Sequence, residues 1–306
     1  MKRRDFLGLT TVAAGTLALN PLTGTAQTTT SEPGEPVWVP LTKDIKTTRI
    51  GFGTGMRGGN RRSDLVRGGY PKGIEMLRYA YDHGIRLFDC ADMYGTHDMV
   101  REALKDKPRD SYVLVTKCWV LPGALPEAER PLPEVLVERF LREFGPRTEY
   151  IDVVQIHCMQ NDRWTREQEA VIESLARAKK AGKIRAHGIS SHSNAATELA
   201  AETEWCDTIH VRLNSEGVAM DGRGAEAVAE TLRTTKKAHD AGKGIICMKV
   251  LGQGEGGMAS NPELRKKSTT FVTQLDCVNV MIVGFTELPH IPEFIANVKA
   301  AEKPKG

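Results

Sequence analysis

Three short apolar segments of the sequence each run into an ionisable residue. In chain order they are 85–88 with Asp89, 113–116 with Lys117, and 151–156 with His157. Alternate residues of a strand face the same side, so Asp89 lies in line with Ile85 and Leu87, and Lys117 with Val113 and Val115. In the same way His157 lies in line with Val153 and Gln155. Tyr94 follows Asp89 in an acidic loop. A carboxylate, an ammonium, an imidazole and a phenol at one edge would form a proton-transfer site.

The elements that would position these residues alternate regularly between strand and helix. The expected strands are 49–53, 85–89, 111–117, 150–156, 184–189, 206–212, 244–248 and 277–283. The expected helices are 72–83, 97–105, 132–143, 165–181, 194–202, 225–240, 263–273 and 290–301. Eight units of roughly 30 residues predict an α/β protein with a closed (β/α)8 barrel, the TIM-barrel fold. In such barrels the chemistry lies at the carboxyl ends of the strands, where all three ionisable residues fall.

Composition excludes several other classes of protein. The chain has 306 residues, a net charge of +3 and 40% hydrophobic residues, which is ordinary for a globular protein. No basic stripe with interleaved aromatics is present, so a nucleic-acid partner is not expected. The six cysteines contain no C-x-x-C pair, so no metal site is expected. By alternation Cys90, Cys118 and Cys158 should face the strand–helix layer, where a three-cysteine metal site is the alternative to plain packing.

The N-terminus has the features of a targeting segment. The run Lys2-Arg3-Arg4-Asp5-Phe6-Leu7 resembles a twin-arginine export signal, and the weakly apolar stretch 7–19 is too short to span a bilayer. We expect cleavage near Gln27, with no stable membrane anchor afterwards. The resemblance implies that the twin-arginine export machinery carries the folded protein to the periplasm or another extracytoplasmic compartment. A basic disordered N-terminus is the alternative.

These patterns predict three parts. Residues 1–26 are expected to be the signal peptide, 27–44 a linker and N-terminal hairpin, and 45–306 the barrel. The hairpin is predicted because the apolar and β-branched runs 37–40 and 45–48 flank a Lys-Asp turn. The polar stretch 60–71 is expected to be a loop.

From about residue 45 onward, the chain resembles the aldo-keto reductase superfamily. The matching segments are Gly53-Thr54-Gly55-Met56, Asp89 with Tyr94, Leu114-Val115-Thr116-Lys117, Gln155-Ile156-His157, Gly188-Ile189-Ser190-Ser191 and Ile282-Val283-Gly284-Phe285. The order Asp, Tyr, Lys, His at successive strand ends is the specific part of the resemblance. It implies hydride transfer between NADP(H), with NAD(H) as the alternative, and a small-molecule carbonyl or alcohol substrate.

The resemblance also implies a role for each residue of this set. Tyr94 would be the general acid and base, and Lys117 would lower its pKa by favouring the tyrosinate. Asp89 would hold Lys117 protonated and aimed, and His157 would orient the carbonyl oxygen. Cofactor contacts are implied for Gly53, Thr54, Ser190, Ser191, Gly284, Phe285 and Thr286.

A second hypothesis starts from departures from the family pattern. Leu213 stands where a tyrosine that stacks on the nicotinamide is common, and His210 where a glutamine is common. The segment 284–287 contains no lysine or arginine for the 2′-phosphate of NADP, and Glu287 would repel one. The chain would then keep the scaffold as a non-redox enzyme or as a binding protein for a sugar-like ligand. The complete Asp-Tyr-Lys-His set favours the reductase, whereas the altered contacts and the export signal favour this alternative.

Four more residues are candidates to line a pocket. Trp119, Trp164 and Met56 could contact a substrate, with barrel or loop packing as the alternative. Lys249 ends a strand before a glycine-rich turn. It is expected to contact substrate or a cofactor phosphate, or to be a solvated loop lysine.

Overall fold

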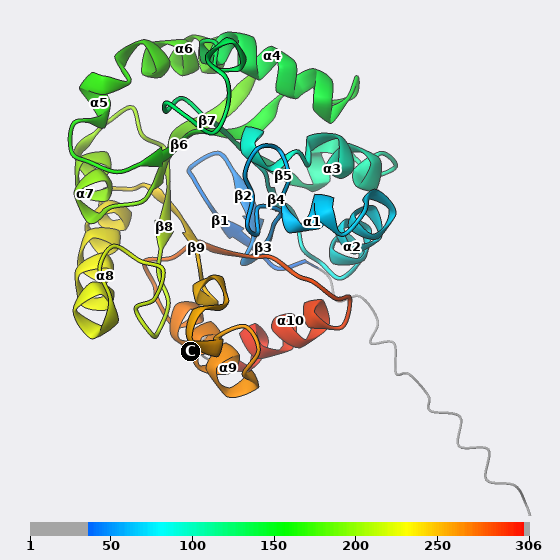
Figure 1. The fold of residues 1–306 in the computed structure, drawn as a ribbon, viewed down its shortest axis with the longest axis vertical. Coiled ribbons are helices and arrows are strands. Elements are labelled where there is room, and N and C mark those ends of the chain that lie inside the picture. The colour runs from blue at the N-terminus through cyan, green and yellow to red at the C-terminus, as the bar shows by residue number, and fades with distance from the viewer. Residues whose placement is uncertain (1–35, 303–306) are drawn as a thin grey trace, which may run out of the picture. The chain divides into compact units, whose positions relative to one another are not determined.

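The computed structural model describes residues 36–302, which form a closed barrel of parallel strands with helices outside it (Figure 1). The barrel strands are β3 (Ile50–Gly53), β4 (Leu87–Asp89), β5 (Val113–Cys118), β6 (Ile151–Met159), β7 (Ile184–Ser191), β8 (Thr208–Arg212), β9 (Gly244–Met248) and β10 (Val280–Val283). Neighbours pair in chain order, and β10 closes the barrel on β3. The predicted (β/α)8 fold is therefore confirmed, and the strand ends meet at one mouth.

The helices lie close to their predicted positions. They are α1 (Asp64–Arg67), α2 (Tyr70–Asp82), α3 (His97–Leu104), α4 (Pro133–Phe144), α5 (Trp164–Glu167), α6 (Glu169–Lys180), α7 (Asn194–Glu202), α8 (Gly224–Asp240), α9 (Pro262–Thr273) and α10 (His290–Ala301). Two expectations were wrong in detail. The segment 60–71 contains the short helix α1, and the predicted helix 165–181 is interrupted at Gln168, which separates α5 from α6.

The alternation of strand residues divides the buried side chains between two layers. Leu87, Val113, Val115 and Val153 belong to the cluster inside the barrel, as the strand pattern predicted. Ile85 was expected on the same face but belongs to the larger cluster between strands and helices. The reason is that β4 begins only at Leu87, so residue 85 precedes the alternating backbone.

The N-terminal hairpin closes the bottom of the barrel. It consists of β1 (Trp38–Pro40) and β2 (Lys46–Thr48), which pair antiparallel as predicted. Its turn residues Leu41 and Ile45 are 2% and 1% exposed and belong to the inner cluster. A Cβ added to Gly244, the first residue of β9, would lie 2.2 Å from the carbonyl oxygen of Leu41. The hairpin is thus packed as part of the barrel domain. The predicted boundary between residues 44 and 45 falls inside the hairpin, between β1 and β2.

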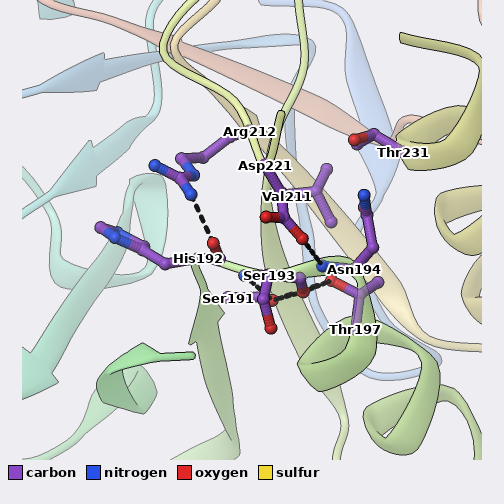
Figure 2. A pocket seen from close by; sticks show the side chains of 9 residues that line it. All are labelled: Ser191, His192, Ser193, Asn194, Thr197, Val211, Arg212, Asp221 and Thr231. Atoms are coloured by element: carbon purple, nitrogen blue, oxygen red, sulfur yellow. Dashed lines mark hydrogen bonds between the residues drawn. The ribbon is translucent and has the colours of Figure 1, made fainter. Parts of the chain in front are cut away.

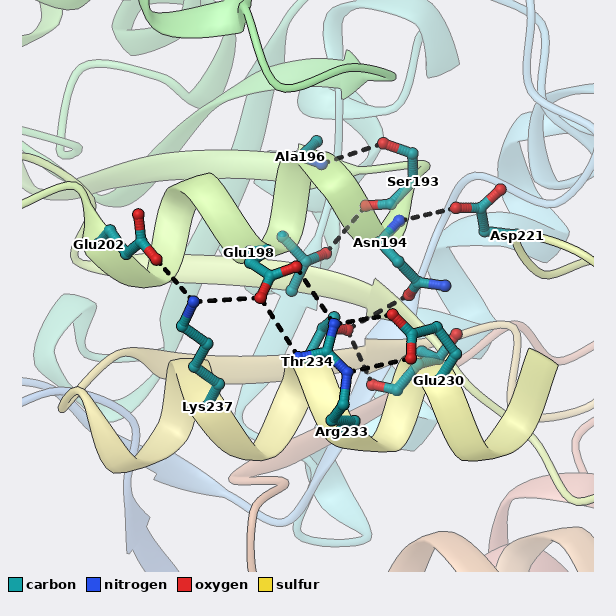
Figure 3. A network of polar contacts seen from close by, with 12 residues as sticks. Ser193, Asn194, Ala196, Glu198, Glu202, Asp221, Glu230, Arg233, Thr234 and Lys237 are labelled. Atoms are coloured by element: carbon teal, nitrogen blue, oxygen red, sulfur yellow. Dashed lines mark hydrogen bonds and ion pairs between the residues drawn. The ribbon is translucent and has the colours of Figure 1, made fainter. Parts of the chain in front are cut away.

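An ion-pair network joins α7 to α8 on the outside of the barrel (Figure 3). Arg233 contacts Glu198 at 3.1 Å and Glu230 at 2.7 Å, and Lys237 contacts Glu198 at 3.1 Å and Glu202 at 2.6 Å. These side chains are largely exposed, so each pair contributes at most about 1 kcal/mol. The network fixes the packing of two helices and lies outside the mouth.

The expected signal peptide and most of the expected linker lie outside the described residues. None of the helices between residues 36 and 302 combines the length and the apolar character that a membrane span requires.

Candidate active site

A buried ion pair lies at the mouth of the barrel. Asp89 ends β4 and Lys117 lies near the end of β5, and these strands are neighbours. The Nζ atom of Lys117 donates to Oδ1 of Asp89 at 2.5 Å and to the carbonyl oxygen of Cys90 at 3.0 Å. Lys117 and Asp89 are 1% and 2% exposed. The predicted contact between these two residues is confirmed.

The structure adds His210 to this pair. Its Nε2 lies 3.0 Å from the same Oδ1 of Asp89, reached across the barrel from β8. Burial alone would raise the pKa of Asp89, but the charge of Lys117 and the contact with His210 outweigh it and hold that pKa below its ordinary value. An ionised carboxylate only accepts hydrogen bonds, so Nε2 of His210 carries the proton. Burial and the charge of Lys117 lower the pKa of His210, which keeps the imidazole neutral.

Tyr94 and His157 lie beside the ion pair. Tyr94 lies in the short 3-10 helix Asp92–Tyr94 that follows β4, and His157 lies near the end of β6. The hydroxyl of Tyr94 is 3.5 Å from Nε2 of His157, and Nζ of Lys117 is 5.4 Å from the centre of the Tyr94 ring. The structure therefore brings together the four residues that the sequence singled out.

The expectation that Lys117 lowers the pKa of Tyr94 is wrong for the protein without ligands. Burial, followed by the negative charge of Asp89, raises the pKa of Tyr94 well above its ordinary value. The ammonium of Lys117 donates to Asp89 and to a carbonyl oxygen, so its charge is largely compensated. Burial and Lys117 lower the pKa of His157 well below its ordinary value. The site thus holds a neutral phenol next to a neutral imidazole.

Two glycines of the first barrel loop set the position of the Tyr94 ring. A Cβ added to Gly55 would lie 2.3 Å from two ring carbons, and one added to Gly58 would lie 2.6 Å from another. Only residues without a side chain allow this close approach. On the other side, the ring of Trp119 stands edge-on to His157, with centroids 5.3 Å apart. Of the pocket candidates, Trp119 therefore does contact the site.

The side chains proposed for cofactor binding differ in whether their hydroxyl already has a hydrogen-bond partner. Ser190 is 1% exposed, and its hydroxyl has no hydrogen-bond partner among residues 36–302. The hydroxyl of Ser191 instead donates to the carbonyl oxygen of Ser193 at 2.7 Å and accepts from Thr197 at 2.8 Å. The hydroxyl of Thr54 donates to the carbonyl oxygen of Asp89 at 2.9 Å. Of these three hydroxyls, that of Ser190 alone lacks a hydrogen-bond partner within residues 36–302.

The side chains that follow the end of β10 are engaged within the protein. Phe285 is 3% exposed and packs against Phe52 and Phe294. Thr286 contacts Nδ1 of His290 at 3.2 Å. Gly284 lies against Met56, and Gly53 lies against the end of β10. Met56 is therefore a packing residue at this loop.

Three other residues that the sequence analysis named have positions in the structure. Glu287 forms an exposed ion pair with Lys72 at 3.0 Å, which partly compensates its charge. Leu213 is fully buried in the cluster between strands and helices, so it does not offer a face to a ligand at the mouth. Trp164 is 1% exposed and packs near Trp205, with ring centroids 6.1 Å apart.

Cys158 does not point where strand alternation predicted. Cys90 and Cys118 belong to the cluster between strands and helices, as expected, but Cys158 does not. Its φ is +69°, and the pairing of β6 with β7 shifts register between Ile156 and Met159. This irregularity brings its Sγ to 3.1 Å from Nδ1 of His192. Among the described residues no three-ligand cluster of His, Cys, Asp or Glu exists, so the three-cysteine alternative is wrong there.

Comparison with known proteins agrees with the geometry. The model of the aldo/keto reductase family matches residues 49–300, which include all eight barrel strands. The chain belongs to the aldo/keto reductase family. The predicted resemblance to this family is thereby confirmed.

Curated family members share part of their sequence with this chain. It is 35% identical over 158 residues to the aldo-keto reductase YhdN of Bacillus subtilis, covering 49% of this chain and 45% of that protein. It is 31% identical over 170 residues to the NADH-specific methylglyoxal reductase of Escherichia coli, covering 50% and 51%. The chain thus spans about half the length of the curated relatives it matches.

A solved family member shows the same fold. The aldo-keto reductase of Klebsiella pneumoniae in complex with NADPH has a TM-score of 0.63 and 18% identity, covering 88% of this chain and 92% of that protein. At this identity the likeness establishes the barrel architecture only.

Proposed function

We propose that this protein is an oxidoreductase that transfers a hydride between NADP(H) or NAD(H) and a small carbonyl or alcohol substrate. The observation that carries the proposal is the buried Lys117–Asp89 pair at 2.5 Å, with the hydroxyl of Tyr94 beside it and 3.5 Å from His157. Family membership supports it, because several named relatives are reductases.

A bound nicotinamide would supply the hydride, and the residues of the chain would manage the proton. Hydride addition to a carbonyl carbon leaves an alkoxide, which needs a proton donor within hydrogen-bond reach. Tyr94 is that donor, and its raised pKa keeps it protonated until the alkoxide forms. An alkoxide is a stronger base than a phenolate, so the transfer remains favourable. Once tyrosinate forms, the nearby ammonium of Lys117 stabilises it.

His157 would position the substrate oxygen. Its imidazole is neutral, so one ring nitrogen can donate to the carbonyl oxygen. Since Nε2 faces the hydroxyl of Tyr94, the substrate oxygen would lie between the phenol and the imidazole. Asp89 and His210 act indirectly, by holding Lys117 in place.

The residues at the mouth fit a nicotinamide cofactor. The hydroxyl of Ser190, buried and without a hydrogen-bond partner among residues 36–302, is suited to bind the carboxamide. Contacts from Gly284, Phe285 and Thr286 are proposed from family membership. The relatives differ in preference, because one solved structure contains NADPH and one relative is named NADH-specific. We therefore propose both nucleotides as candidates and expect a titration to rank them.

The test combines binding and turnover. Fluorescence titration should show binding of NADPH or NADH to nucleotide-free protein. Tyr94→Phe should lower the rate of carbonyl reduction by about 10²–10⁴-fold, because the proton donor is lost, while the Kd of the nucleotide changes less than about twofold. Failure of both nucleotides to bind would favour the non-redox hypothesis, and unchanged turnover in the variant would remove Tyr94 from its role.

We propose in addition that the chain is exported. The support is the sequence of residues 1–26, with its paired arginines and short apolar stretch. The twin-arginine machinery would be the transient partner, and the mature protein would begin near Gln27 in the periplasm or another extracytoplasmic compartment. Cell fractionation of the full chain tests this. Changing Arg3 and Arg4 to Lys should retain the protein in the cytoplasm, and unchanged export would contradict the proposal.

A further inference from the structure

Two cations lie together on the wall of the mouth that faces the ion pair. Arg212 is the last residue of β8, and Lys249 directly follows β9. These strands are neighbours, and Arg212 lies in register with Met248, the residue before Lys249. In the order of the barrel, β8 lies four strands from β4, which carries Asp89. Arg212 therefore lies across the barrel from Asp89, and Lys249 lies beside it at the end of the neighbouring strand.

Neither cation has an acidic partner. Within residues 36–302 no carboxylate lies within 4.0 Å of the charged atoms of Arg212 or Lys249, and the amine of Lys249 makes no hydrogen bond. Arg109, by contrast, is 13% exposed and contacts Asp152 at 2.6 Å. Arg49, Arg86 and Arg130 are half-buried and, within residues 36–302, bind backbone carbonyl oxygens only. What distinguishes Arg212 and Lys249 is that two such cations end neighbouring strands at the mouth.

The guanidinium of Arg212 is held in place from one side only. One of its nitrogens donates to the carbonyl oxygen of His192 (Figure 2). That contact is neutral. Asp221 attracts the guanidinium from a longer distance and opposes the lowering of its pKa, but no carboxylate of residues 36–302 forms an ion pair with it. Lys249 has a φ of +61°, a conformation that residues other than glycine rarely adopt. Both side chains are half-buried, so they are sheltered from bulk water without being sealed in the core.

The charges of this pair affect each other and the reacting residues. Burial, then Arg212 and then Lys117 lower the pKa of Lys249 to about 8, whereas Asp89 acts in the opposite direction. Burial also lowers the pKa of Arg212. Two half-buried like charges repel each other, and an anion bound between them would offset this repulsion. Both cations end strands at the mouth that holds Asp89 and Lys117, so an anion bound between them would lie at this mouth.

We propose that Arg212 and Lys249 form a binding site for one anionic group of the substrate, a carboxylate or a phosphate, opposite Tyr94. That the bound anion belongs to the substrate rests on the proposed reductase function. Anion binding by Arg212 and Lys249 does not depend on that function. The preferred substrates are then carbonyl compounds that carry an acidic group. Arg212 would supply a planar fork of donors and Lys249 a point charge.

The first experiment measures anion binding without cofactor or turnover. Oxalate and inorganic phosphate are titrated into the nucleotide-free protein, followed by calorimetry and by the thermal unfolding midpoint. We expect Arg212→Met and Lys249→Met each to weaken anion binding by about tenfold, the loss of one charge-assisted contact. Without anion, Lys249→Met should unfold at the same temperature as the wild type or higher, because like-charge repulsion is relieved. Equal anion affinity in wild type and variants would overturn the proposal.

Lys266→Met is the matched control. Lys266 is exposed on α9, so this variant loses the same charge away from the mouth. Its anion affinity should stay within about twofold of the wild type, since only screened long-range attraction changes. A loss as large as that of Lys249→Met would mean that net charge alone attracts anions, and would overturn the proposal.

The second experiment distinguishes a substrate anion from the cofactor diphosphate. KM is measured for 4-carboxybenzaldehyde and for its uncharged methyl ester. Lys249→Met should raise KM about tenfold for the acid only, with kcat and the Kd of NADPH and NADH within about threefold. An equal rise in KM for both aldehydes would mean that Lys249 does not bind the carboxylate of the substrate. A matching loss of nucleotide affinity would mean that it binds the cofactor diphosphate. Either result would overturn the proposal. If neither aldehyde reacts in wild type, the reductase proposal fails, and the anion titration still decides this site.

Discussion

Replacing Lys117 with Met should reveal how strongly the mouth of the barrel depends on its buried ion pair. Met has nearly the length of Lys but no charge, so the variant leaves the carboxylate of Asp89 buried without its ammonium partner. His210 remains as a neutral donor to the same oxygen. The main change is therefore electrostatic and not a loss of packing.

The size of the effect follows from burial and distance. At 2.5 Å and an effective dielectric constant of about 20, the Coulomb attraction is about 6.6 kcal/mol before desolvation is subtracted. Breaking a buried pair by removing one partner typically costs about 3–5 kcal/mol. With about 2 °C per kcal/mol for a domain of this size, the midpoint of thermal unfolding should fall by about 6–10 °C.

The effect should also depend on pH in a defined direction. In the wild type, the lowered pKa of Asp89 contributes stability that is present above its unfolded pKa of about 3.9 and is lost as the pH falls through the folded value. In the variant, protonation of Asp89 or of His210 relieves the uncompensated charge. Since either route takes up a proton, the variant should regain stability relative to the wild type as the pH falls from 7 toward 4.

Lys107→Met provides the matched control. Lys107 contacts Asp82 at a similar distance, 2.7 Å, but these side chains are 29% and 52% exposed. This substitution should cost less than about 1 kcal/mol. Chemical denaturation at pH 7, 5.5 and 4 measures all three proteins. The reasoning is refuted if Lys117→Met loses no more stability than Lys107→Met, or if its deficit does not change with pH.

Three further outcomes are expected. Gly55→Ala should displace the Tyr94 ring and lower kcat by about 10²-fold, whereas Gly59→Ala, with nothing within 4 Å of its added Cβ, should stay within about twofold in the same kinetic assay. Oxalate affinity, measured by calorimetry, should fall as the pH rises through about 8, because Lys249 then loses its proton. Cys158 should react slowly with iodoacetamide at pH 7.5, as followed by mass spectrometry, since burial raises its pKa and disfavours the thiolate.

Much of the site was predictable because strand alternation is a local rule. The parity of Leu87 with Asp89, and of Val113 and Val115 with Lys117, placed each ionisable residue in line with the barrel interior, and the structure agrees. The same rule was wrong for Cys158. A positive φ and a register shift in β6 interrupt the alternation there, and no residue pattern in the sequence signalled the irregularity.

The sequence by itself determined the order of strands and helices, the set Asp89, Tyr94, Lys117 and His157, and the family. These depend on hydrophobic period and residue type, which are properties of short segments. Only the tertiary structure decided that His210 binds Asp89, 121 residues away, and that Arg212 and Lys249 lie half-buried at neighbouring strand ends without an ion-pair partner among residues 36–302. Closure of the barrel sets these distances, because it brings strand ends together that no local pattern relates. The same closure buries Tyr94 and raises its pKa, which the sequence had predicted in the opposite direction.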